Sequence, residues 1–152
     1  MNVVRLFFRR TAAERLLLFE ALFCLLHAKA AVRLLPFRRI APHLGEEQAE
    51  TPATVPAAER AIAVDVSWAV QAVARWVPLR FVCLPQAIAA QRMLRRRGVG
   101  STLYFGATPG AGDFSALALH AWLRTGDKIV TGEGEMRTHQ AVASFAVPSS
   151  PR

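Results

Sequence analysis

The spacing of the apolar residues changes near Gly98, and this change limits the fold classes open to the chain. Before Gly98, apolar residues recur at helical spacing, as at Ile62, Val66, Val70 and Val73. After Gly98, short β-prone segments follow one another, at 102–105, 117–123, 129–131 and 142–147. Helices followed by consecutive short strands predict an α+β fold with a small antiparallel sheet.

Capping and breaking residues predict three helices before this change of spacing. Thr11 begins a capping box, and the helix that follows it is expected to end before Pro36. A second helix is predicted over 59–77. A third is predicted from Cys83 to Gly98, because proline is favoured in a first turn and glycine at a helix end.

Composition divides the chain into four parts. Residues 1–45 are expected to form a helical N-terminal subdomain, and residues 57–147 the core. Between them, 46–56 has two prolines, three glutamates and one bulky apolar residue, which is typical of a flexible, solvated linker. Residues 148–152 are expected to be a frayed tail.

The chain is strongly basic. Nineteen Lys and Arg residues against eleven Asp and Glu give a formal net charge of +8. Such a balance favours an acidic partner, which is a peptide, a nucleic acid or an anionic membrane surface. No nucleic-acid module accompanies the basic residues, so no nucleic-acid partner is predicted.

No membrane-spanning segment is predicted. The longest run within 16–35 that lacks a formal charge or a histidine is 21–26, and a span needs roughly 20 residues. Glutamates also interrupt what would be a signal peptide. Two cysteines are too few for a disulfide framework, so a cytoplasmic location is predicted. Contact of the helix in 1–35 with a membrane surface is the alternative.

A cysteine and a histidine stand where a nucleophile and its base belong. Cys83 begins a predicted helix, where backbone N–H groups and the helix dipole favour a thiolate and can hold an oxyanion. His120, on a predicted strand, can take the thiol proton and later protonate the leaving amine. His139, in an expected loop, is a rival base. The plain alternative is that these are structural residues, as expected for Cys24 in the core.

The stretch CLPQAIAAQRMLRRRGVGSTLYFGA, at 83–107, followed by LHAWLRTGDKIVTGE, at 119–133, resembles the B proteins of lasso peptide biosynthesis. The resemblance covers roughly 59–145, and the helical block before it also looks like the start of such proteins. These proteins are leader peptidases with a transglutaminase-like, papain-related fold. The resemblance implies a cysteine peptidase that removes the leader from a lasso peptide precursor, with Cys83 as nucleophile and His120 as base.

The resemblance also implies partners. A separate cyclase related to asparagine synthetase would use ATP to close the macrolactam ring, so no cofactor is expected in this chain. Many family members carry or recruit a small leader-recognition domain. No segment here has the expected length and strand-rich pattern, so recognition by a separate protein is expected. The alternative function is a non-catalytic scaffold that presents the precursor to the cyclase.

The third catalytic residue departs from the family pattern. Family members commonly have an aspartate about twelve residues after the histidine, and Gly132 stands at this position. A two-residue turn at 126–127 would make Glu133 face His120, so that its carboxylate could orient the imidazole. A three-residue turn would put Gly132 opposite His120 instead. The remaining alternative is a Cys–His dyad.

Three further features complete the sequence predictions. Trp122 is expected on the opposite face of the sheet from His120, packed in the core. The glycine-rich segment 106–114 is expected to be a flexible loop between strands, and the alternative is that it borders the active-site cleft. No histidine cluster has metal-ligand spacing. The arginines at 95–97 suit a helix C-terminus, and their alternative role is a docking patch for an acidic leader or the cyclase.

Overall fold

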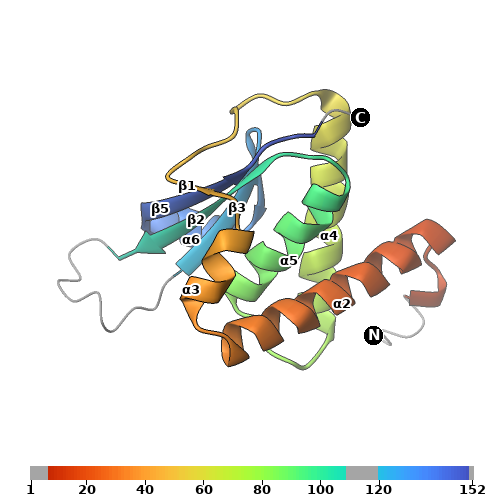
Figure 1. Ribbon diagram of the computed structural model, residues 1–152. Helices are drawn as coiled ribbons and strands as arrows, with labels where there is room; N and C mark the ends of the chain where they lie inside the picture. Colours follow the sequence, from red (N-terminus) through yellow and green to blue (C-terminus); the bar gives the residue numbers. More distant parts are fainter. Residues whose placement is uncertain (1–6, 109–119, 151–152) are drawn as a thin grey trace.

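The computed structural model describes residues 7–108 and 120–150 (Figure 1). The predicted α+β class is confirmed, with helices before the first long strand and an antiparallel sheet after it. The elements in chain order are α2 (Ala12–Leu34), α3 (Phe37–Ile40), η1 (Ala41–His43), β1 (Glu46–Glu47), α4 (Ala57–Trp76), α5 (Cys83–Arg96), β2 (Ser101–Ala107), β3 (His120–Thr125), β4 (Lys128–Thr131), α6 (Glu133–Thr138) and β5 (Gln140–Val147).

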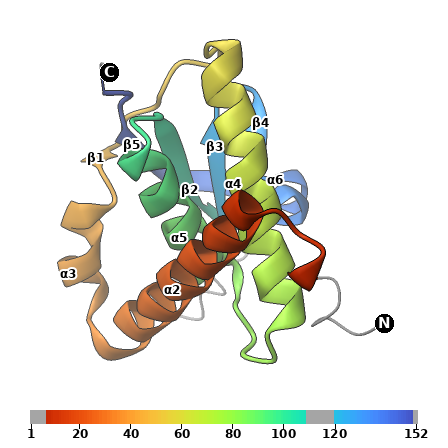
Figure 2. The same ribbon diagram turned by 90° about the vertical axis from the view of Figure 1, so that its right-hand side faces the viewer.

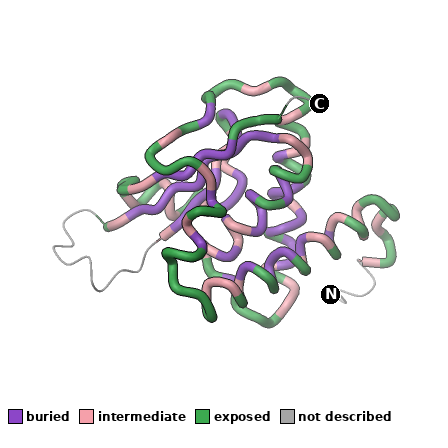
Figure 3. Tube along the Cα trace, viewed as in Figure 1, coloured by how far each residue is buried: buried purple, intermediate pink, exposed green. Residues whose placement is uncertain are grey.

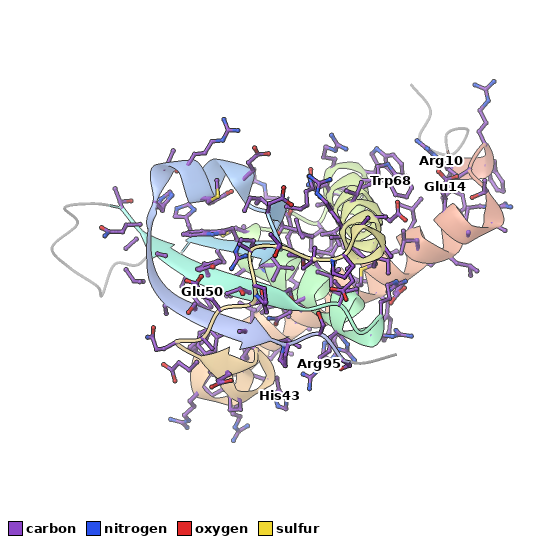
Figure 4. All side chains as sticks on the ribbon, turned by 90° about the horizontal axis from the view of Figure 1, so that it is seen from above. Arg10, Glu14, His43, Glu50, Trp68 and Arg95 are labelled. Carbon is purple, nitrogen blue, oxygen red and sulfur yellow. The ribbon has the colours of Figure 1, made fainter. Side chains whose placement is uncertain are left out.

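The sheet has the strand order β1-β5-β2-β3-β4, and each neighbouring pair is antiparallel. Alternate residues of a strand point to opposite faces. Leu103, Phe105 and Leu123 therefore point to one face, where they join the hydrophobic core beneath the helices. Tyr104 and Trp122 point to the other face and stack on each other. Figure 4 shows α3 and α6 on opposite sides of the strands.

Helix α2 shares one hydrophobic core with the rest of the molecule. Its capping box is present as predicted, with the Thr11 hydroxyl accepting from the backbone N–H of Glu14. The helix packs against α4 and α5, and its fully buried Leu25 belongs to the same cluster as Val66 of α4 and Met93 of α5. Figure 3 shows this buried zone where the helices meet the sheet. The regions predicted as a subdomain and a core are therefore joined by continuous packing.

The segment 46–56 is largely exposed, as its composition predicts, but it is attached to the sheet. Its first two residues form β1, which pairs with β5 at the edge of the sheet. Thr51 is buried, and its backbone N–H donates to the Thr102 hydroxyl oxygen at 2.8 Å. The guanidinium of Arg124 donates to the carbonyl oxygen of Thr51 at 2.9 Å. The edge strand of a sheet has unpaired backbone N–H and C=O groups, with which a polar segment can form hydrogen bonds. Composition alone does not predict such pairing.

The expected frayed tail, 148–152, is also anchored as far as it is described. The Ser149 hydroxyl oxygen accepts from the backbone N–H of Gly100 at 3.0 Å and donates to Glu59 at 3.1 Å. Residues 151–152 lie outside the described part of the chain. Within the described part, no helix has both the length and the apolar character needed to cross a membrane.

Candidate active site

Cys83 is the first residue of α5. The residue before it, Val82, has no polar side chain to cap the helix, and the first turn contains no acidic residue. The positive end of the helix dipole therefore lies at Cys83, where a negative charge is stabilised. Its side chain is half-buried against the edge of the core. Cys83 is therefore a candidate nucleophile.

Cys24 has the opposite environment. It lies on α2 with a side chain that is 1% exposed, in the core as predicted. Burial, followed by the nearby Glu20 carboxylate, raises the pKa of the Cys24 thiol. A thiol held in its protonated form in the core is unreactive, so Cys83 is the better candidate nucleophile.

His120 begins β3 and has a buried, unsatisfied ring nitrogen. It is half-buried and pairs with Gly106 of β2. Its Nδ1 atom is buried and has no hydrogen-bond partner in the structure. Leaving a buried polar atom without a partner costs about 1–3 kcal/mol. Groups of this kind are found where a reactive or binding partner is to be met.

The ring of His120 stacks on that of His139, which sequence reasoning placed in a loop. The two ring centroids are 3.9 Å apart, and the ring planes differ by 28°. His139 follows α6 directly, as its C-terminal cap. Spacing along the chain did not predict this contact, because α6 was not expected and the two histidines lie on different elements. His120 is on β3, and His139 is at the end of α6. His139, the rival base predicted from the sequence, thus lies next to His120.

Hydrogen bonds define the tautomer of His139. Its Nδ1 lies 3.0 Å from the carbonyl oxygen of Glu135 and 2.8 Å from the hydroxyl oxygen of Thr138. The Thr138 hydroxyl itself donates to the carbonyl oxygen of Gly134 at 3.0 Å. A carbonyl oxygen only accepts, so Nδ1 of His139 must carry the hydrogen. The imidazole is therefore held against the end of α6 while its face supports His120.

The elements that carry Cys83 and His120 are neighbours. Helix α5 packs against β3. In both Figure 1 and Figure 2, the start of this helix and the start of this strand lie at the same end of the molecule. The predicted nucleophile and base therefore stand on neighbouring elements, which start at the same end of the molecule.

Trp122 shares a sheet face with His120, contrary to the prediction. The two residues are two positions apart in β3, and strand side chains repeat with a period of two. Trp122 is buried, as predicted, but against Tyr104, with ring centroids 5.5 Å apart. Gly106 makes room for this arrangement, because a Cβ atom there would lie 2.4 Å from the Trp122 ring and 3.0 Å from His139. The glycine-rich segment predicted as a flexible loop lies mostly in 109–119, outside the described residues.

The predicted pairing of Glu133 with His120 is wrong, because a β-bulge shifts the register. The two-residue turn at 126–127 is present, since Thr125 pairs with Lys128. The register then shifts between Leu123 and Arg124, so that one extra residue of β4 is accommodated. Counting on from the shifted pairs would put Ala121, and not His120, opposite Glu133.

Glu133 also leaves the sheet altogether. Gly132 turns the chain with φ at +78°, and Glu133 becomes the first residue of α6. Its side chain is 61% exposed, and its carboxylate accepts from the Arg137 guanidinium at 2.7 Å. The structure thus brings His139 to His120 and directs Glu133 to Arg137.

A basic groove lies between α2, α3–η1 and the C-terminal half of α5. Its volume is about 550 Å³, and none of the residues that line it is acidic. Figure 4 shows two of its residues, His43 and Arg95, on the same side of the molecule. The basic lining consists of His27, Arg39, His43, Arg92, Arg95 and Arg96, over an apolar floor that includes Leu35, Ile40, Leu44 and Ile88. The arrangement suits a ligand with both acidic and apolar groups.

The arginines at 95–97 have separate roles. Arg95 and Arg96 line this groove, and Arg96 also lies 3.5 Å from the Glu20 carboxylate of α2, to which Arg97 turns. Two hydrogen bonds, of 2.6 and 3.0 Å, join the Arg97 guanidinium to the Glu20 carboxylate. This bidentate pair links the end of α5 to α2. The docking alternative for the arginine run is therefore open to its first two members.

The Glu20–Arg97 pair predicts a pH dependence of stability. The hydrogen bonds from Arg97 lower the pKa of Glu20 below its usual 4.5 in the folded state. This stabilisation is therefore present above pH 4.5 and is lost as the pH falls through the folded-state pKa. We expect Glu20→Gln to lower the free energy of unfolding by about 1–2 kcal/mol at pH 7.

Urea denaturation at several pH values checks this expectation. The difference between Glu20→Gln and wild type should shrink as the pH falls below 4.5. Glu47→Gln, at an exposed position of β1, is the matched control and should show almost no difference at any pH. A loss of stability that is equal at pH 7 and at low pH would contradict the role of this charge pair.

The described part of the chain contains no group of three or more His, Cys, Asp or Glu side chains that could hold a metal ion.

Comparison with known proteins identifies the family. The family model of the transglutaminase-like superfamily matches residues 22–146, which run from within α2 to within β5 and include Cys83 and His120. No curated protein and no solved structure gives a significant match. The chain belongs to the transglutaminase-like superfamily.

Proposed function

We propose that the chain is a cysteine peptidase that cleaves the leader from a lasso peptide precursor before macrolactam closure. Membership of the transglutaminase-like superfamily supports cysteine hydrolase chemistry. The observation that carries the proposal is the buried, unpartnered Nδ1 of His120, on a strand packed against the helix that Cys83 begins. The similarity of 83–107 and 119–133 to lasso peptide B proteins supplies the substrate class.

In the proposed reaction, the Cys83 thiol transfers its proton to His120 and the sulfur attacks the carbonyl carbon between leader and core peptide. The backbone N–H of Cys83 stabilises the oxyanion that forms. His120 then gives the proton to the leaving amine, which releases the core peptide and leaves the leader as a thioester on Cys83. Water hydrolyses the thioester, with His120 again acting as base, and this step restores the free thiol.

His139 takes the supporting role that a carboxylate has elsewhere in the family. Its ring stacks on His120 at 3.9 Å and is itself fixed by the Glu135 carbonyl oxygen. A stacked ring restricts the plane of the His120 imidazole. The proposed catalytic unit is therefore a Cys–His dyad with an aromatic support.

The proposed partners follow from the same resemblance. A separate leader-recognition protein would present the precursor, and an asparagine-synthetase-like cyclase would use ATP to close the ring. The basic groove over α5 supports docking of an acidic stretch of the leader, because its lining combines arginines with apolar residues. The chain is proposed to work in the cytoplasm.

Mass spectrometry of a reconstituted reaction tests the proposal. The mixture contains precursor peptide, the leader-recognition protein, the cyclase, ATP and this chain. Wild type should release the leader, and Cys83→Ala should release none, because alanine has no nucleophile. Cys24→Ala is the matched control, since it removes the other thiol and should leave cleavage intact. Cleavage by a folded Cys83→Ala variant would refute the assignment.

A second candidate is a non-catalytic scaffold that presents the precursor to the cyclase. The engagement of Glu133 by Arg137, away from His120, favours it, because the family's third catalytic position lacks a usable carboxylate. A scaffold should bind the leader equally well as wild type and as Cys83→Ala, with no cleavage by either protein. That result, obtained with every partner present, would replace the peptidase proposal.

A further inference from the structure

The outward face of α2 is a continuous apolar stripe. Four large side chains on it are exposed: Leu16 by 70%, Phe19 by 58%, Phe23 by 64% and Leu26 by 42%. Two exposed alanines extend the stripe at its ends, Ala12 and Ala30. We name these six residues the α2 stripe. Exposed apolar areas of this kind mark interaction surfaces.

The α2 stripe is opposite the face with which α2 packs on the molecule. The buried residues of the helix, which include Ala21, Leu25 and Ala28, face α4 and α5. Figure 2 shows α2 crossing in front of these two helices, and no other described element lies over its outer face. The ring of Phe7 contacts Phe19 edge-on at 5.4 Å and still leaves it largely exposed.

The spacing of the α2 stripe indicates a helix as its partner. Its residues follow one another at intervals of four, three, four, three and four positions. This is the alternation of a and d positions in a coiled-coil heptad. It gives a narrow seam about 80° wide on a helical wheel, whereas a helix that lies on a membrane or a core presents an apolar face of at least about 100°.

The α2 stripe is also palindromic, and this identifies the partner. Read in either direction from Ala21, its residues are Phe, Leu and Ala. When two copies of α2 lie antiparallel about a two-fold axis at Ala21, like residues meet. The layers are Phe19 with Phe23, Leu16 with Leu26, and Ala12 with Ala30, each taken from opposite copies. In an antiparallel coiled coil a positions face d positions, which is the pairing found here.

We propose that the chain forms a two-fold symmetric homodimer through antiparallel packing of the α2 stripe. An interface of this type is self-complementary, so every contact occurs twice. The helix of 23 residues is about 34 Å long and offers an adequate length. Only part of each side chain is exposed, so that about 150–250 Å² for each large side chain becomes roughly 400 Å² per copy for the four together. This is about half of the ~800 Å² that each partner buries in a standard interface, and the flanks of the helix supply further area.

The charges beside the stripe determine how salt affects association. Each copy carries a formal charge of +8. Like charges oppose association, and salt screens them. The dimer should therefore become tighter as salt is raised, whereas attachment to an anionic membrane would become weaker. The effect of salt therefore distinguishes a second copy of the chain from a lipid surface as the partner of the α2 stripe.

Light scattering after size-exclusion chromatography tests the proposal. Wild type should approach twice 16.7 kDa as its concentration rises, and more readily at high salt. Leu16→Glu alone and Leu26→Lys alone should each weaken association by more than about 100-fold, because a charge is buried against leucine. The double variant Leu16→Glu/Leu26→Lys should recover it, since each new charge meets its opposite. Val142→Glu, an exposed apolar position on β5, is the control and should stay dimeric.

Disulfide trapping tests the register directly, in a Cys83→Ala background. Neither Ala12→Cys nor Ala30→Cys should cross-link with itself, and a mixture of the two should form a covalent dimer. Cross-linking of Ala12→Cys with itself would indicate parallel helices and overturn the proposal. A protein that stays monomeric at every concentration would also overturn it, and binding to anionic vesicles would then identify a membrane surface. These readouts are independent of peptide cleavage.

Discussion

Replacing His120 by alanine is expected to lower the rate of leader cleavage by about 10²- to 10⁴-fold, the usual contribution of a positioned acid and base. The reason is that His120 both removes the thiol proton and protonates the leaving amine in the proposed reaction. The buried Nδ1 of His120 has no hydrogen-bond partner, so the substitution breaks no hydrogen bond of this atom. The measurement is the initial rate of leader release, followed by mass spectrometry.

Glu133→Gln is the matched control for this expectation. The Glu133 carboxylate bonds to Arg137 on the surface of α6, so its replacement should change the rate by less than about twofold. His139→Ala should slow cleavage and His139→Phe should restore part of it, because phenylalanine keeps a ring against His120. A large loss in Glu133→Gln with His120→Ala still active would contradict the dyad.

Replacing Gly132 by alanine is expected to lower the free energy of unfolding by about 3 kcal/mol or more. Its φ of +78° disfavours any side chain, and a Cβ atom would lie 2.6 Å from the carbonyl oxygen of Ala121 and 2.7 Å from Cβ of Trp122. The clash is with backbone and with a buried strand residue, so it cannot be relieved by a rotamer change. At about 2–4 °C for each kcal/mol, the melting temperature should fall by roughly 6–12 °C.

Gly134→Ala provides a control within the same helix. A Cβ atom at Gly134 would meet nothing within 4 Å, so this variant should be neutral or more stable by up to about 1 kcal/mol. Gly132→Asp, which restores the residue type common in the family, should be destabilised like Gly132→Ala and should not gain activity. Equal melting temperatures for Gly132→Ala and Gly134→Ala would show that the strain argument is wrong.

Local sequence signals predicted the regular elements well. The capping box at Thr11 marks the start of α2, and the helix is observed to begin at the next residue. The prediction of a helix start at Cys83 is confirmed by α5. The strands after Gly98 are observed where β-prone residues were found, in the described part of the chain. These features depend on dihedral preferences and spacing within a few residues, which a single sequence contains.

Contacts between residues that are far apart in the sequence were not predicted. Thr51 is buried, and its backbone N–H donates to the Thr102 hydroxyl oxygen. Nothing in the composition of the polar segment 46–56 indicates this contact. The bulge shifts the register between β3 and β4 by one residue, and Gly132 then turns the chain into α6, so Glu133 does not face His120. Register is specified by packing on both faces of a sheet, so a count of residues outward from a turn fails at the first bulge.

The sequence by itself determined the α+β class, the family resemblance and the positions of Cys83 and His120 at the starts of a helix and a strand, because each depends on local pattern. Only the tertiary structure decided that His139 stacks on His120 and that Glu133 binds Arg137. It also decided which face of α2 stays uncovered. These outcomes depend on which surfaces meet when helices and strands pack, and contacts between residues far apart in the chain have no local signal.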